Sequence, residues 1–190
     1  MIRTFTRIVL VAMAVSVTAC ANVKLDATSA TPATVEKLRA ANLTSAQAGT
    51  FKLAPGKDAS MDTSLSGLRG NSLSPAKGAW SQLLKDTLVL ELTASGLYDT
   101  QSRYVIEGQL TDSMVDAAIG TGTGRLAARF TVTNAGQKVF EKEIVAEASW
   151  ESSFMGAVAI PAAIDQYSAL YKKLVAKLVD DPEFRRALAK

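Results

Sequence analysis

The residue with the clearest chemistry in this sequence is Cys20. It is the only cysteine of the 190 residues, and it ends the run Val17-Thr18-Ala19-Cys20. This run has the pattern of a bacterial lipobox, in which the chain is cut before the cysteine and its thiol carries a diacylglyceryl group. A cysteine placed at such a cut would become the first residue of the mature chain. The sequence therefore predicts lipidation at Cys20, and several acyl chains would hold the chain firmly on a membrane.

The residues before Cys20 fit a signal peptide. Within residues 1–19, the basic residues Arg3 and Arg7 come near the start, an apolar stretch follows them, and small residues come last. The alternatives are an ordinary secretory signal or an N-terminal anchor helix, although the apolar stretch is about half of the roughly 20 residues that span a membrane. Ala21 follows the cysteine, where an Asp would favour retention in the inner membrane of enteric-type bacteria. We therefore expect the periplasmic face of the outer membrane.

Composition excludes several classes of function. The chain from residue 20 onward has the size of one domain. The formal charge of the full sequence is +3, of which Arg3 and Arg7 supply two units, and no polybasic cluster follows them, so we expect no nucleic-acid partner. Histidine, the commonest general base, is absent from the sequence. We predict no catalytic residue, no metal ion and no cofactor. Composition leaves the oligomeric state open.

Three short patterns suggest chemistry only weakly. The run Ser74-Pro75-Ala76-Lys77 is an S-x-x-K pattern, but no K-T-G run accompanies it, so we interpret it as a helix cap with a surface lysine. The Gly120–Gly124 segment alternates Gly and Thr between two predicted strands, which favours a hairpin or a bulged strand end over a phosphate loop. Asp112 and Asp116 are interpreted as solvated loop residues rather than a catalytic pair.

The first half of the mature chain predicts few regular elements. Residues 20–31 are interpreted as a lipidated tether and 32–190 as a single periplasmic domain. Thr31-Pro32 predicts the start of a short helix that ends near Ala41. Gln47 to Leu53 is a predicted strand, and the polar residues 56–73 are a predicted long loop.

Regular patterns dominate the second half. Helical spacing predicts a long helix over 75–95 that ends at Gly96. Alternation of apolar and polar residues predicts three strands, and these lie over 104–110, 125–133 and 138–150. Lys142 interrupts the apolar face of the last strand, so we expect it near a sheet edge.

The turn Asn134-Ala135-Gly136 predicts the pairing of the last two strands. A three-residue loop would place Phe130 opposite Phe140 in the core, and Arg129 opposite Glu141 in solvent. A second long helix follows from Pro161, and Asp181-Pro182 ends it and caps a short last helix, in which Phe184 and Leu188 face inward. The predicted fold is α+β, an antiparallel sheet of about four strands with two long helices packed on one face.

The link between the last strand and the second long helix is unusually apolar for a connection. It is interpreted either as a buried crossover or as an exposed patch for a partner or a lipid surface. The candidate contact residues are Trp150, Phe154, Met155, Val158 and Ile160.

The sequence also resembles a known family. The lipobox, a helix ending in LTASGLY, the strand YVIEGQL, a Gly/Thr-rich hairpin and the terminal YKKLVAKLVDDPEFRRAL together resemble the YajG-type outer-membrane lipoproteins. The layout is also similar to auxiliary lipoproteins of ABC-type lipid transporters and to the periplasmic part of curli-secretion lipoproteins. The resemblance covers about residues 74–190 and is architectural. It implies a non-enzymatic envelope component that docks onto other proteins, and it transfers no binding residue.

Two hypotheses follow. The first is a non-catalytic envelope lipoprotein that serves as an accessory or assembly subunit for other envelope proteins. The alternative is a carrier of lipid or another hydrophobic ligand, which a pocket lined by Trp150, Phe154 and Tyr167 would support.

Overall fold

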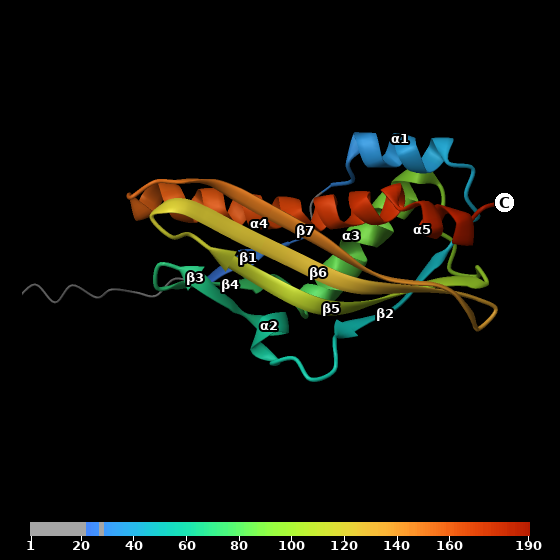
Figure 1. Cartoon of the computed structure of the whole chain (residues 1–190), viewed down its shortest axis with the longest axis horizontal. Helices are drawn as coiled ribbons and strands as arrows, with labels where there is room; N and C mark the ends of the chain where they lie inside the picture. Colours follow the sequence, from blue (N-terminus) through green and yellow to red (C-terminus); the bar gives the residue numbers. More distant parts are fainter. Residues whose placement is uncertain (1–21, 27–28) are drawn as a thin grey trace, which may run out of the picture.

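The computed structural model describes residues 22–26 and 29–190, so the predicted signal peptide and Cys20 lie outside the described residues. The described chain folds into two sheets and five helices (Figure 1). In chain order the elements are β1 (Asn22–Leu25), α1 (Pro32–Ala40), β2 (Gln47–Leu53), α2 (Ser60–Thr63), β3 (Leu65–Leu68), β4 (Asn71–Pro75), α3 (Trp80–Ser95), β5 (Tyr104–Asp116), β6 (Gly120–Asn134), β7 (Gln137–Ser152), α4 (Gly156–Asp180) and α5 (Pro182–Ala187).

The larger sheet has the strand order β2-β5-β6-β7. The α+β class is confirmed, but the sheet is mixed rather than antiparallel because β2 runs parallel to β5. The chain between these two strands is long and includes α3, as a parallel crossover requires. α4 packs along β6 and β7, while α3 packs against β2 and β5. Of the five helices in the described chain, the two long ones (α3 and α4) and two short ones (α1 and α5) were predicted, whereas α2 was not.

A second sheet of the described chain has the order β1-β4-β3. The prediction of a loop over 56–73 is wrong, since this segment contains α2, β3 and part of β4. Residues 22–25, expected in a tether, form β1 and pair in parallel with β4. The strands of this sheet are too short for a clear alternation of side chains. Their burial depends instead on a few leucines, namely Leu65, Leu68 and Leu73.

The first long helix begins later than predicted. Pro75 is the last residue of β4, and the backbone N–H of Ala76 donates a hydrogen bond to the carbonyl of Leu25 at 2.7 Å. Gly78 then turns the chain with a φ of +61°, and α3 starts at Trp80. Ser74 is therefore a buried strand residue, and its interpretation as a helix cap is wrong. The predicted end of the helix is confirmed, because Gly96 has a left-handed φ of +78°.

The β6–β7 hairpin has a two-residue turn instead of the predicted three-residue loop. Ala135 and Gly136 both have positive φ, as a type I′ turn requires, and Asn134 pairs with Gln137. A bulge at Val139 then shifts the register by one residue. As a result Phe140 lies opposite Val132 instead of Phe130.

The predicted cross-strand pairs of this hairpin are therefore wrong by two residues. Phe130 lies opposite Lys142, and Arg129 lies opposite Glu143 instead of Glu141. The predicted faces are correct nonetheless, because Phe130 and Phe140 are both buried. The expectation that Lys142 lies near an edge is confirmed, since β7 is an edge strand of its sheet.

The last two helices complete the core. α4 begins at Gly156, earlier than predicted, and includes Pro161 within its second turn. The predicted cap of α5 is confirmed, since the carboxylate of Asp181 accepts hydrogen bonds from the backbone N–H groups of Glu183 and Phe184. Phe184 is fully buried and packs edge to face against Phe140, with ring centroids 5.6 Å apart.

Candidate functional site

Three turns meet at one end of the molecule, which is also the end where β1 begins (Figure 1). They are the β3–β4 turn at 69–70, the β5–β6 turn at 117–119 and the β7–α4 turn at 153–155. The first residue of β6, Gly120, pairs with Ser152 at the end of β7, which brings the second and third turns side by side. The strand ends therefore position one composite surface.

Arg69 joins these turns. Its backbone has a left-handed φ of +52°, and its guanidinium reaches across to both of the other turns. The Nε–H donates to the carbonyl of Ala117 at 2.7 Å, and Nη1 donates to the carbonyl of Phe154 at 2.8 Å. Nη2 donates to the carbonyl of Ser153 at 2.6 Å and to the hydroxyl of Ser152 at 3.2 Å. One side chain thus links all three turns by hydrogen bonds.

Four apolar side chains project from this end, and we call them the apolar tip. Ile119 is 71% exposed, Phe154 77%, Met155 51% and Val158 53%. Three of them, Ile119, Phe154 and Val158, line a surface hollow of about 590 Å³, and Glu151 is the charged residue of its lining. Burial of such side chains on binding would be favourable, because each removes apolar surface from water. The arrangement suits contact with an apolar surface.

The five predicted contact residues are only partly brought together. Phe154, Met155 and Val158 belong to the apolar tip. Trp150 and Ile160 are half-buried and pack against the core instead. Ile119 and Arg69 are not among the predicted contacts. The one signal for Ile119 is its type, since an isoleucine is unusual at the turn between two strands.

Trp150 explains the Gly/Thr-rich segment. It lies opposite Gly122 on the neighbouring strand, and a Cβ atom added at Gly122 would lie 2.3 Å from the indole ring. Gly124 is also close-packed, with a methyl group of Leu170 3.1 Å from the position of its Cβ. The glycines therefore let the indole ring and α4 approach the sheet. The segment was predicted as a hairpin or a bulged strand end. It is the first part of β6, and its pairing with β7 runs from Gly120 to Gly124 without a bulge.

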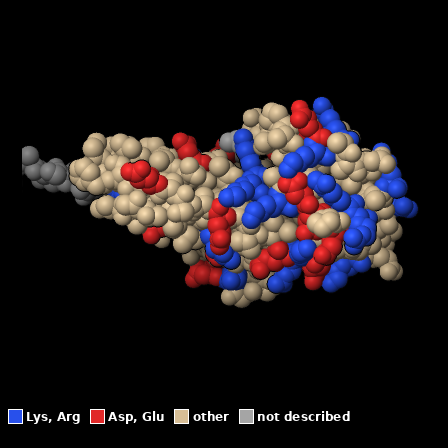
Figure 2. Space-filling model, turned by 45° about the horizontal axis from the view of Figure 1, so that its top comes forward, with Lys and Arg blue, Asp and Glu red and all other residues tan. Residues whose placement is uncertain are grey.

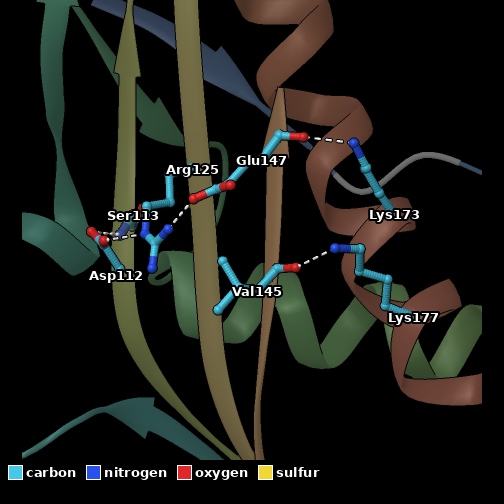
Figure 3. A network of polar contacts seen from close by, with 7 residues as sticks. All are labelled: Asp112, Ser113, Arg125, Val145, Glu147, Lys173 and Lys177. Atoms are coloured by element: carbon cyan, nitrogen blue, oxygen red, sulfur yellow. Dashed lines mark hydrogen bonds and ion pairs between the residues drawn. The ribbon is translucent and has the colours of Figure 1, made fainter. Parts of the chain in front are cut away.

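A polar network crosses the exposed face of the larger sheet (Figure 3). The Nε–H of Arg125 donates to the carboxylate of Asp112 at 2.8 Å, and its Nη1 forms an ion pair with Glu147. The hydrogen bond to Asp112 raises the pKa of the Arg125 guanidinium, with Glu147 adding to this and partial desolvation opposing it. Asp112 is thus an ion-paired strand residue, and its interpretation as a loop residue is wrong. Asp116 is exposed at the end of β5.

The edge of β7 continues this network (Figure 3). Lys173 and Lys177 reach from α4 and donate hydrogen bonds to the carbonyls of Glu147 at 2.6 Å and Val145 at 2.8 Å. These carbonyls point away from β6 and would otherwise be open to another strand. Along this part of the edge, the network therefore protects the sheet.

The space between α4 and the sheet is filled. Tyr167 is fully buried, and its hydroxyl is hydrogen-bonded to Ser113 Oγ at 2.8 Å and to the Tyr171 hydroxyl at 2.9 Å. Burial raises the pKa of both tyrosines. Because Phe154 is exposed and Tyr167 is buried, these residues do not line a common pocket with Trp150. The pocket on which the carrier hypothesis depends is not formed by these three residues.

Two absences hold for the described residues, 22–26 and 29–190. Within them, no three His, Cys, Asp or Glu side chains are grouped as a metal ion would require. In the same part of the chain, no helix is both long enough and apolar enough to cross a bilayer.

A similar fold is found in a solved structure. Protein XCC0632 from Xanthomonas campestris, assigned to the DUF330 family, has 15% sequence identity and a TM-score of 0.54, and the alignment covers 84% of this chain and 95% of that chain. A minor lipoprotein from Acinetobacter baumannii has 16% identity and a TM-score of 0.42, with 78% and 96% covered. No protein-family model matches the chain, and the comparison with curated proteins finds no match.

Proposed function

We propose that this chain is a non-catalytic bacterial envelope lipoprotein. A lipid on Cys20 holds it at the periplasmic face of the outer membrane, where it docks onto other envelope proteins as an accessory or assembly subunit. The observation that carries the proposal is the place of Cys20 relative to the fold. β1 begins at Asn22, two residues after the cysteine, so a cut before Cys20 would remove no residue of the described fold.

The accessory role is supported by the surface that the fold leaves open. One face of the larger sheet is covered by α3 and α4, while the other face carries exposed charged side chains of both signs. Arg125, Arg129 and Glu143 line a hollow of about 510 Å³ on that face. Charged groups of this kind give specificity to protein contacts. The architectural resemblance to YajG-type lipoproteins suggests the same role.

Fractionation of cells that express the full chain tests the anchor. Cys20→Ala removes the thiol that would carry the lipid, so the protein should leave the membrane fraction or keep its signal peptide. Ala21→Asp should shift the lipidated protein to the inner membrane, whereas the matched control Ala21→Ser should leave it in the outer membrane. A Cys20→Ala protein with the wild-type mature mass in the outer membrane would contradict the proposal.

Site-specific photo-crosslinking in the same cells tests the docking role. A photoreactive residue at Arg129, exposed on the open sheet face, should capture an envelope protein. The same residue at Gln166, exposed on α4, serves as the control and should not. Capture of no envelope protein, together with turnover of a small molecule by the purified protein, would show that the chain is not an accessory subunit.

A further inference from the structure

We propose that the apolar tip inserts into the interfacial layer of the same bilayer that holds Cys20. The domain would then be attached at two points, by its lipid and by its own side chains, and its orientation would be fixed. This inference rests on the lipid anchor of the proposed function. It goes further because it assigns a lipid surface to Ile119, Phe154, Met155 and Val158.

The start of β1 and the apolar tip lie at the same end of the molecule. Asn22 pairs with Ser72, at the start of β4 and directly after the β3–β4 turn. From that turn Arg69 reaches the carbonyls of both turns that carry the tip. Two residues of extended chain span at most about 7 Å, so a lipid on Cys20 would enter the membrane close to the point where β1 begins. A connection this short leaves the domain little freedom to point another end at the bilayer.

Charge is distributed as this orientation requires. Figure 2 shows that on the visible face the end at the left is largely uncharged, while Lys, Arg, Asp and Glu crowd the rest of the molecule. Insertion of charged groups into a bilayer is costly, whereas Phe, Ile, Met and Val gain from it. Two exposed carboxylates lie beside the tip, Glu151 at the border of the hollow and Asp116 at the end of β5, and both would remain at the level of the hydrated headgroups.

Backbone carbonyl groups at the tip already accept hydrogen bonds within the protein, which suits an environment with little water. Turns expose carbonyl groups, and unpaired carbonyls are costly to move out of water. The guanidinium of Arg69 already satisfies the carbonyls of Ala117, Ser153 and Phe154. The hydroxyl of Ser152 donates a further hydrogen bond to Ala117 at 3.4 Å. The apolar side chains can therefore enter the interface without exposing these three carbonyls to it.

The same geometry favours lipid over protein as the occupant of the tip. Any protein bound there would have to fit between the domain and the membrane, into a space that the short connection to Cys20 limits. The open face of the larger sheet, with its hollow around Arg129, is not restricted in this way. Partners and lipid are thus assigned to different surfaces.

Depth measurement with a fluorescent label tests the insertion. The full lipidated chain with Phe154→Cys is labelled with an NBD dye and reconstituted into phosphatidylethanolamine/phosphatidylglycerol vesicles that contain doxyl-labelled lipid. With the Cys20 thiol acylated, the new cysteine is the only free thiol. We expect strong quenching by the lipid and a blue-shifted emission. The control is Val139→Cys, 43% exposed at the opposite end of β7, which should show neither effect.

A second variant distinguishes a failure of the insertion from a failure of the lipid anchor. Ile119→Asp combined with Val158→Asp places two charges on exposed positions of the tip, so it should remove the quenching at residue 154 while the protein still sediments with the vesicles. Sedimentation of the labelled protein without quenching at residue 154 would overturn the insertion and leave the anchor intact. Equal quenching at residues 139 and 154 would also overturn it. Failure to sediment at all would overturn the anchor, and the insertion with it.

Discussion

The contact between Trp150 and Gly122 shows how one missing side chain shapes this end of the molecule. The indole ring occupies the space in which a Cβ of Gly122 would lie, at 2.3 Å from the ring. Gly122→Ala should force the ring or the strand to move, and overpacking of this kind costs about 1–3 kcal/mol of unfolding free energy. Urea unfolding followed by circular dichroism measures the loss.

A matched glycine provides the control. Gly156 opens α4, and an added Cβ there would meet only Ile160 Cδ1, at 3.8 Å. Gly156→Ala should leave the stability unchanged or raise it slightly, because alanine is the better helix former. If Gly122→Ala were as stable as the wild type, the ring would have to move without cost, and the close approach would not explain the glycine.

At the scale of residues, sequence patterns could predict the apolar tip only in part. Phe154, Met155 and Val158 lie close together in the sequence, so they can be recognised as an apolar link between two regular elements. Ile119 comes from a different turn, and Arg69 from a segment interpreted as a loop. The distances that bring them together are set by the pairing of Gly120 with Ser152 and by long-range hydrogen bonds. A pattern of neighbouring residues does not contain such information.

At the scale of elements, the β6–β7 hairpin shows that the buried face of a strand can be predicted correctly although its cross-strand partners are wrong. The two-residue turn alone would place Phe140 opposite Thr131 and so on the exposed face, because side chains alternate along a strand. The bulge at Val139 adds one residue and returns Phe140 to the core. Burial of the aromatic ring was therefore predictable from alternation, while the bulge was not.

The junction of α4, α5 and β7 has an acid-sensitive connection. Lys142 Nζ lies 2.8 Å from the carboxylate of Asp181, which also caps α5. Burial alone would raise the pKa of Asp181, but the hydrogen bond from Lys142 and those from the N–H groups of Phe184 and Glu183 outweigh burial and lower the pKa. A lowered pKa in the folded state means that the ionised form stabilises the fold.

Because the pKa of Asp181 is lowered in the folded state, its contribution to stability depends on pH. The contribution of Asp181 is present above its unfolded pKa of 3.8 and is lost as the pH falls through the lower folded value. Asp181→Asn should therefore lower the thermal midpoint at pH 7, and its difference from wild type should shrink below pH 3.8. Asp165→Asn, exposed on α4, is the control and should change neither. A deficit of Asp181→Asn that is the same at pH 7 and in acid would exclude the ionic contribution.

At the scale of the whole molecule, the sequence predicted one sheet where the described chain has two. Three strands of the larger sheet, β5, β6 and β7, are long and alternate, so their type was predictable, and so was the helical character of α3 and α4. β1, β3 and β4 have only four or five residues each, and β1 pairs with β4, which lies about fifty residues further along the chain. They become strands because they pair with each other. Local propensity does not determine such pairing.

The edge of β7 is a place where whole molecules could associate by strand pairing. Lys173 and Lys177 cover the carbonyls of Glu147 and Val145, which a second chain could otherwise use to extend the sheet (Figure 3). Removal of both lysines should therefore favour larger species. We expect the double variant Lys173→Ala/Lys177→Ala to show a concentration-dependent rise in sedimentation coefficient relative to the wild type, measured on the detergent-solubilised lipoprotein.

The control must remove the same charge without opening the edge. Lys172→Ala/Lys190→Ala also deletes two lysines, but the hydrogen bonds to the β7 carbonyls come from Lys173 and Lys177 and are kept in this variant. This variant should sediment as the wild type does, because β7 remains covered. Equal association of the two double variants would assign the effect to net charge. Unchanged sedimentation of both would show that the packing of α4 along β7 is sufficient to protect the edge without its lysines.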